Sequence, residues 1–237
     1  MAHLKRLVAS KHFPIERKVR TFIVTPAPGP HAKDECIPMQ VVLREMLHLA
    51  AGSVEVKKIL NSRAVKVDGR IVTDPKFPVG LMDVIDIPKV NSAYLVAPVG
   101  GVLTLHKIDS KEAAAKLSRI QGKTTIEGGK FQLNLHDGRC IIVSEAEAKE
   151  YAVGDSVKIS VPEQKILAHY KLKVGNLGMI GKGKYAGTIG AVKEILLVKG
   201  REPNKAILDV KGEEVRTIKD YIFIIGEKKA EIALSEK

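Results

Sequence analysis

Residues 55–70 read Glu-Val-Lys-Lys-Ile-Leu-Asn-Ser-Arg-Ala-Val-Lys-Val-Asp-Gly-Arg, and the hydrophobic period changes inside this stretch. Its first half has helical spacing, with Lys57 and Lys58 on the side opposite the apolar residues Val56, Ile59 and Leu60. In its second half, apolar and polar residues alternate up to Asp68-Gly69, a strong signal for a two-residue hairpin turn. The stretch therefore predicts a short helix followed by a β-hairpin.

The residues before this stretch predict a first helix. Its apolar face would be formed by Met39, Val42, Leu43, Met46, Leu47 and Ala50. Gly52-Ser53 then separates the two helices, because Gly suits a C-terminal cap and Ser suits an N-cap. His48, near the apolar face, is interpreted as a histidine at the edge of the core. With a further strand at Val84–Ile87, closed by Pro88, residues 39–88 predict two short helices and a small sheet.

After Pro88 the chain predicts mainly short strands separated by Gly-containing turns. The expected strands are Tyr94–Val96, Val102–Leu105, Thr124–Ile126, Phe131–Leu135, Cys140–Val143 and Val157–Val161. One helix is expected from Ser110, a capping residue, to Ile120. In the last third, five strands that could form a barrel are expected at Ile180, Thr188–Ile195, Ala206–Val210, Glu214–Thr217 and Tyr221–Ile225.

The two ends of the chain carry charge and little apolar periodicity. Thr25-Pro26-Ala27-Pro28-Gly29-Pro30 excludes a helix or a central strand, because each Pro lacks an N–H and restricts the residue before it. The first residues therefore predict an extended basic arm that buries little of itself and becomes ordered only against a partner. The charged tail Lys228–Lys237 is expected to be frayed.

Positive charge is concentrated in particular regions of this 237-residue chain, whose formal net charge is +12. Residues 1–20 carry six cations and one acid, residues 57–70 five and one, and residues 163–211 ten and four. Residues 107–160 are nearly neutral, with nine cations and eight acids. This pattern indicates a polyanionic partner, with nucleic acid ahead of an anionic membrane surface. No stretch approaches the roughly 18 apolar residues of a membrane span, and the N-terminus lacks the apolar region of a secretory signal.

The candidate enzymatic motifs fail on their chemistry. Gly178–Tyr185 nearly matches the phosphate-binding loop GxxxxGK[ST], but Tyr185 replaces the metal-binding hydroxyl, and strand-like sequence follows where a helix is needed. His136-Asp137-Gly138 is typical of a turn. Cys36 and Cys140 form no CxxC pair and the histidines are scattered, which argues against a zinc site or a disulfide and for reduced thiols in the cytoplasm. We expect no catalytic residue, cofactor, bound metal or small-molecule substrate.

The basic residues give better candidate sites. Lys57, Lys58 and Arg63 would lie close to Lys66 and Arg70 of the hairpin and form one basic surface that contacts phosphates. The alternative is that these cations only increase solubility. Gly181–Lys184 places Lys182 and Lys184 on a loop tip that could approach a sugar–phosphate backbone, with an ordinary hairpin loop as the alternative.

These residues resemble a known family. Residues 55–60, 65–70, 73–75 and 77–85, together with His3–Leu7 and Pro28–His31, closely resemble small-subunit ribosomal protein four, e-type, of archaea and eukaryotes. Gly175-Asn176-Leu177 with Gly183, Gly187 and Ile189-Gly190 resembles its KOW module. The sequence departs from the family at Phe13, where Trp is frequent, and at Thr188, where a basic residue is usual and whose charge Lys182 and Lys184 could replace.

The resemblance implies an α+β multidomain protein without catalysis, whose partners are small-subunit ribosomal RNA and neighbouring ribosomal proteins. The expected parts are an N-terminal arm (1–38), an S4-like helix–helix–hairpin domain (39–92), a central β-rich domain (93–170), an SH3-like KOW barrel (171–226) and a tail (227–237). RNA contacts are expected from Lys57, Lys58, Lys66 and Arg70, and from Lys5, Arg6 and His12 of the arm. We predict a structural, cytoplasmic, ribosomal RNA-binding protein. The alternatives are an RNA-modifying enzyme with an S4-like domain and a KOW-type transcription factor.

Overall fold

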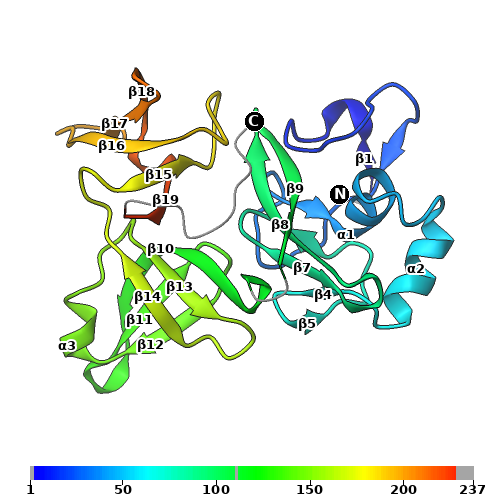
Figure 1. Cartoon of the computed structure of the whole chain (residues 1–237), viewed down its shortest axis with the longest axis horizontal. Coiled ribbons are helices and arrows are strands. Elements are labelled where there is room, and N and C mark those ends of the chain that lie inside the picture. Colours follow the sequence, from blue (N-terminus) through cyan, green and yellow to red (C-terminus); the bar gives the residue numbers. More distant parts are fainter. Residues whose placement is uncertain (1–2, 110–111, 228–237) are drawn as a thin grey trace. The chain divides into compact units, whose positions relative to one another are not determined.

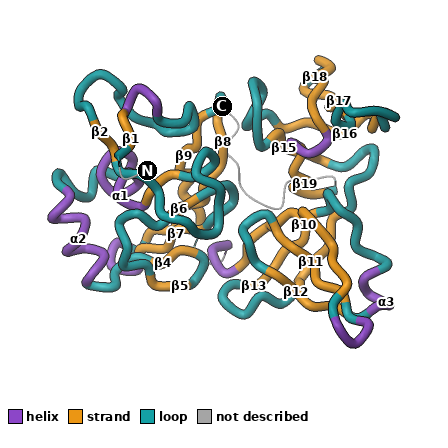
Figure 2. Tube along the Cα trace, turned by 180° about the vertical axis from the view of Figure 1, so that it is seen from behind, coloured by secondary structure: helices purple, strands orange, loops and turns teal. Residues whose placement is uncertain are grey.

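A computed structural model describes residues 3–109 and 112–227 of the chain, which form two compact units (Figures 1 and 2). Among the described residues, unit 1 contains those within 3–98 and 102–116, and unit 2 contains those within 99–101 and 117–227. None of the helices in the described part of the chain is long and apolar enough to cross a bilayer.

Unit 1 is built on a five-stranded sheet with two helical segments beside it (Figure 1). The strand order is β5-β4-β7-β8-β9. The bounds are β4 Lys66–Val67, β5 Arg70–Ile71, β7 Val84–Ile87, β8 Ser92–Val99 and β9 Val102–Ile108. The helical segments are α1 Met39–Val41, which continues directly into η2 Val42–Met46, and α2 Ser53–Asn61. The predicted helix–helix–hairpin order is therefore confirmed, and the short helix η3 Pro88–Val90 connects β7 to β8.

The first helix ends earlier than predicted. Its last turn, η2, is a π-helix in which the Leu47 N–H donates to the Val42 carbonyl at 3.0 Å, so the helix closes at Met46 instead of Ala50. His48 follows with a left-handed φ of 52° and an exposed side chain. The prediction that His48 lies on the helix at the edge of the core was therefore wrong, because the wider turn carries the chain away from the helix axis.

The N-terminal arm packs onto unit 1. Its short elements are β1 Leu4–Lys5, η1 Arg6–Val8, β2 Phe22–Ile23 and β3 Ile37–Pro38; β1 pairs with β2, and β3 pairs with β6 Pro78–Val79. Ala9, Phe13 and Ile23 are buried in the same apolar core as the helices. The expectation that the arm buries little of itself was wrong, because a few well-spaced apolar side chains reach a core formed by residues far along the chain.

Unit 2 contains two five-stranded sheets, the first of which includes strand β10, whose first two residues belong to unit 1. The first has the order β12-β11-β10-β13-β14. Its bounds are β10 Ala115–Thr125, β11 Phe131–Leu135, β12 Cys140–Val143, β13 Ser156–Ser160 and β14 Ile166–Tyr170. Short helices are η5 Glu127–Gly129 and α3 Glu145–Ala148, whose Ser144 and Glu147 form a capping box.

The prediction of a helix from Ser110 to Ile120 was wrong. Ser110 lies outside the described residues, η4 Glu112–Ala114 is a single short turn, and Ala115 begins strand β10. Residues 111–117 have high helix propensity, but β10 pairs with β11 from Ile120 to Thr125. Pairing between strands of the sheet outweighs local helix propensity, which is a weak preference.

The second sheet of unit 2 confirms the five strands expected in the last third. Its order is β18-β17-β16-β15-β19. The bounds are β15 Leu177–Ile180, β16 Ile189–Leu196, β17 Lys205–Val210, β18 Glu213–Ile218 and β19 Ile222–Gly226, with η6 Lys219–Tyr221 before β19. Strand β16 needs glycine at position 190 for a steric reason, because a Cβ there would lie 2.4 Å from the Asp209 carbonyl oxygen of β17.

Candidate nucleic-acid interface

Helix α2 presents Lys57 and Lys58 to solvent. Val56 and Leu60 of the same helix are completely buried, which fixes the helix face that packs on the core and leaves both lysines exposed. Arg63 lies just beyond the helix end with a left-handed φ of 53°, and its N–H donates to the Leu60 carbonyl at 2.9 Å. The packing of α2 therefore displays a cluster of cations at its exposed face and C-terminal end.

The predicted Asp68-Gly69 hairpin is confirmed, and its register separates the two hairpin cations. Asp68 and Gly69 have φ values of 48° and 72°, as a tight hairpin turn with two positive φ angles requires. Lys66 pairs with Ile71, and Val67 pairs with Arg70. Since directly opposed residues share a face, Lys66 and Arg70 lie on opposite faces of the hairpin, with Lys66 half-buried and Arg70 exposed.

The α2 cations and the hairpin are close neighbours in the chain. Arg63 and Lys66 are three residues apart, so their Cα atoms lie within about 10 Å. Among the described residues, no carboxylate forms an ion pair with Lys57, Lys58, Arg63, Lys66 or Arg70. We call these five residues the helix–hairpin cations. The structure brings four of them to the exposed surface and leaves Lys66 partly covered.

A buried charged network fixes the hairpin turn beneath this surface. The fully buried Lys116 Nζ donates to Asp68 Oδ2 at 2.7 Å and to Asp83 Oδ1 at 2.6 Å. His31 Nε2 of the arm lies 2.9 Å from Asp83 Oδ2. The Val84 N–H donates to Asp68 Oδ1 at 2.9 Å. Thus the arm, the hairpin turn, the loop before β7 and the first residues of β10 meet at one set of charges.

Burial and the charges in this network shift the pKa values of Asp68 and Asp83 in opposite directions. Burial alone would raise the pKa of Asp83, but the Lys116 ammonium and His31 outweigh it and hold that pKa well below its usual range. For Asp68, burial and the negative charge of Asp83 outweigh Lys116 and raise the pKa. We call Lys116, Asp68, Asp83 and His31 the buried network.

The sequence analysis missed the buried network. Asp68 was assigned only to turn chemistry, and the Asp83 and His31 side chains had no role. The fold alone shows why Gly80 stands beside the network, because an added Cβ there would lie 2.4 Å from the His31 ring.

The three arm candidates are placed differently. Lys5 is exposed, and His12 is half-buried. Arg6 is only 3% exposed; its Nη2 donates to Glu45 Oε1 at 2.8 Å and its Nη1 donates to the Glu16 carbonyl at 2.7 Å. Arg6 therefore has a structural role in place of the expected RNA contact. Its guanidinium, which the sequence analysis treated as free to bind RNA, attaches the arm to helix η2.

The Gly-rich loop of unit 2 connects β15 to β16. Lys184 is exposed, with its Nζ 5.5 Å from the Tyr185 ring centroid, and Lys182 is half-buried. The Gly187 N–H donates to the Ile180 carbonyl at 2.7 Å, which closes the loop as a hairpin connection. The chain continues into strand β16 and not into a helix, so this loop lacks the helix N-terminus that a nucleotide-binding loop needs.

Comparison with known proteins identifies the family. The sequence model of the ribosomal family S4e matches residues 91–166, that of the RS4NT domain matches residues 2–34, and that of the S4 domain matches residues 42–85. The small ribosomal subunit protein eS4 of Methanothermobacter thermautotrophicus is 42% identical over 98% of this chain and 95% of its own. The chain belongs to the ribosomal S4e family.

Further relatives agree with this assignment. The eS4 protein of Methanocaldococcus jannaschii is 39% identical over 98% of this chain and 97% of its own. The crystal structure of the 30S ribosomal protein S4e from Thermoplasma acidophilum aligns with a TM-score of 0.70 at 33% identity, covering 82% of this chain and 97% of that one. The resemblance read from the sequence is therefore confirmed, and S4e membership makes the chain a ribosomal protein and not an enzyme.

Proposed function

We propose that this S4e protein is a structural constituent of the small ribosomal subunit, in the cytoplasm, that binds small-subunit ribosomal RNA through the helix–hairpin cations. The carrying observation is that these cations extend from the S4 domain without carboxylate partners among the described residues. RNA phosphates supply the missing negative charge. Contacts of this kind bind and orient folded RNA by its backbone and shape without reading the bases.

The pairing of cations elsewhere supports this proposal. Several exposed lysines in unit 2 have acid partners; for example, Lys165 pairs with Glu163 at 2.7 Å, and Lys193 pairs with Glu214. Pairs of this kind reduce the local positive potential, whereas the helix–hairpin cations keep theirs. The buried network supports the same surface, because it holds Asp68 at the hairpin turn between the two short strands.

We extend the proposal to the rest of the chain. The sheet order β18-β17-β16-β15-β19 and the Gly-rich β15–β16 loop support an SH3-like KOW barrel within residues 171–226, with Lys184 as a second RNA contact and Lys182 beside it. Lys5 and His12 are proposed contacts from the arm, and neighbouring ribosomal proteins are proposed partners. Of the domain limits read from the sequence, 39–92 contains the S4 match. The two alternatives, an RNA-modifying enzyme and a KOW-type transcription factor, lose support with membership of the S4e family.

The test is the salt dependence of binding to a small-subunit RNA fragment. Each phosphate contact contributes about −0.7 to −0.9 to the slope of log K against log salt concentration. K57Q/K58Q should therefore flatten the slope by about 1.4 to 1.8. The matched control K107Q/K130Q removes the same charge from exposed positions in the nearly neutral segment and should leave the slope unchanged. A flat salt response of the wild type would contradict the proposal.

A further inference from the structure

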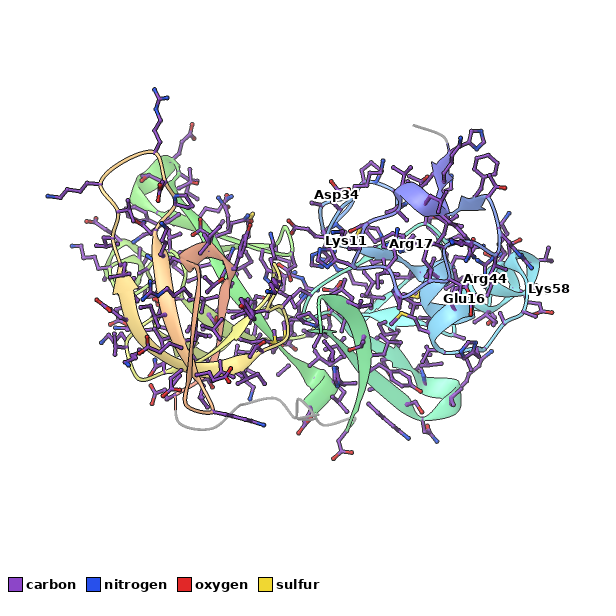
Figure 3. The ribbon with its side chains drawn as sticks, turned by 90° about the horizontal axis from the view of Figure 1, so that it is seen from above. Lys11, Glu16, Arg17, Asp34, Arg44 and Lys58 are labelled. Atoms are coloured by element: carbon purple, nitrogen blue, oxygen red, sulfur yellow. The ribbon has the colours of Figure 1, made fainter. Side chains whose placement is uncertain are left out.

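A polar pocket of about 390 Å³ lies between the arm and the end of helix η2. We call it the arm–helix pocket. Its charged and titratable lining residues are Arg6, Glu16, Arg20, Arg44, Glu45 and His48. Figure 3 labels Arg44 and Glu16 side by side, with Lys58 of helix α2 farther out on the same unit. None of the five helix–hairpin cations is among the residues that line the pocket.

The pocket contains hydrogen-bond donors that no acceptor in the described residues uses. Glu45 accepts from both Arg6 Nη2 and Arg44 Nη2 at 2.8 Å. Burial alone would raise the pKa of Glu45, but these hydrogen bonds outweigh it and lower the pKa, so this carboxylate is ionised and occupied. The buried Arg6 Nε–H finds no acceptor within the described parts of the chain. Arg20 is exposed and forms no ion pair or hydrogen bond with any described residue.

The backbone at the pocket rim is unusual in two ways that require support from the surrounding fold. Helix η2 is a π-helix, a form that is rare and frequent at functional sites. His48 has a left-handed φ of 52°, which is unfavourable for a residue with a side chain and places the exposed imidazole at the pocket. A glycine would fit this conformation without strain. The fold thus holds a residue with a bulky side chain in a left-handed conformation at the rim of the pocket.

We propose that the arm–helix pocket holds one unpaired nucleotide of the bound RNA. Arg20 and Arg44 hold its phosphate, and Glu16 accepts a hydrogen bond from a base edge or from the ribose 2′-hydroxyl. A nucleotide fits better than a bare phosphate for two reasons. The Glu16 carboxylate would repel a bare phosphate, whereas a nucleotide also offers hydrogen-bond donors to it. The volume of the pocket is also that of a small-molecule site. Unpaired nucleotides are the parts of RNA whose edges proteins read. This inference rests on the proposed RNA binding.

The test compares R20Q with K18Q in the full chain, using small-subunit ribosomal RNA as the probe. Both substitutions remove one exposed arm cation, but Lys18 does not line the pocket. R20Q should weaken binding about 10- to 150-fold, the loss expected for a charged hydrogen bond, and K18Q less than about fivefold. H48G suits the left-handed backbone and should keep the fold, but it removes the imidazole that lines the pocket and should therefore also weaken binding.

The second readout is acylation of RNA 2′-hydroxyl groups, which reacts with mobile, unpaired nucleotides. We expect one nucleotide that wild type and K18Q protect and that R20Q and H48G leave reactive. Equal losses for R20Q and K18Q, or no nucleotide that follows this pattern, would overturn the pocket assignment while wild-type binding still supports the proposed function. Wild-type protein that binds no RNA would instead overturn the proposed function.

Discussion

Replacing Lys116 with methionine removes the ammonium of the buried network while keeping most of the side-chain volume. The Lys116 side chain is fully buried, and its Nζ lies 2.7 Å from Asp68 Oδ2 and 2.6 Å from Asp83 Oδ1. Without it, two buried carboxylates face each other. Removing one partner of a buried ion pair costs about 3 to 5 kcal/mol, which corresponds to a roughly 150- to 5000-fold larger opening constant for unit 1.

Native-state amide hydrogen exchange measures this opening locally. The Val84 N–H donates to Asp68 Oδ1 at 2.9 Å and the Gly80 N–H donates to Asp83 Oδ2 at 2.8 Å, so both amides should exchange faster in K116M. Because the pKa of Asp68 is already raised, proton uptake should make the loss smaller at pH 5 than at pH 8.

A control variant separates buried from exposed charge. K165M removes a lysine that pairs with Glu163 on an exposed surface and should leave exchange unchanged. If K116M opens unit 1 no more than K165M does, the network does not stabilise the fold and the reasoning is refuted.

Three further predictions follow from single sites. Burial, more than the neighbouring acids, raises the pKa of the Cys36 thiol to about 12, whereas Cys140 is exposed. Iodoacetamide at pH 8 should therefore add one group per folded chain, at Cys140, which mass spectrometry of peptides can check. Fast labelling of Cys36 would contradict its burial. Because the pKa of Asp83 is lowered in the folded chain, its carboxylate stabilises the fold at pH values above the pKa of the unfolded chain, about 4, and this stabilisation is lost as the pH falls. The urea midpoint of the wild type should therefore decrease below about pH 4 more steeply than that of D83N. G190A places a Cβ 2.4 Å from a carbonyl oxygen of β17 and should destabilise unit 2 by about 1 to 3 kcal/mol. In the control G200A the added Cβ meets no atom within 4 Å, so the thermal midpoint should stay unchanged. Equal midpoints for the two variants would show that β16 adapts freely.

The sequence was sufficient where local signals determine structure. Asp68-Gly69 predicted a hairpin because few residue pairs accept two positive φ angles, and alternating apolar residues predicted strands β15 to β19. The capping residue Ser110 misled the prediction because a capping signal is local, while the strand that Ala115 begins is held along Ile120–Thr125 by pairing with β11.

The sequence was insufficient where distant segments meet. Lys116 is 48 residues from Asp68 and 33 from Asp83, so no spacing rule could connect them. Counting charge also overestimated the free cations, because Arg6 is buried against Glu45. The left-handed conformation of His48, which marks the rim of the arm–helix pocket, depends on a π-helical turn that helical periodicity cannot reveal.

The central claim is that exposed cations of the S4 domain hold this chain on the small ribosomal subunit. Sucrose-gradient sedimentation of cell extract at about 0.1 M salt, with the tagged chain detected in each fraction, tests it most directly. The account predicts that the wild type and K107Q/K130Q travel with small subunits, and that K57Q/K58Q/R63Q/R70Q remains at the top of the gradient. Wild-type chain at the top of the gradient, or the fourfold variant bound as firmly as the wild type, would contradict it.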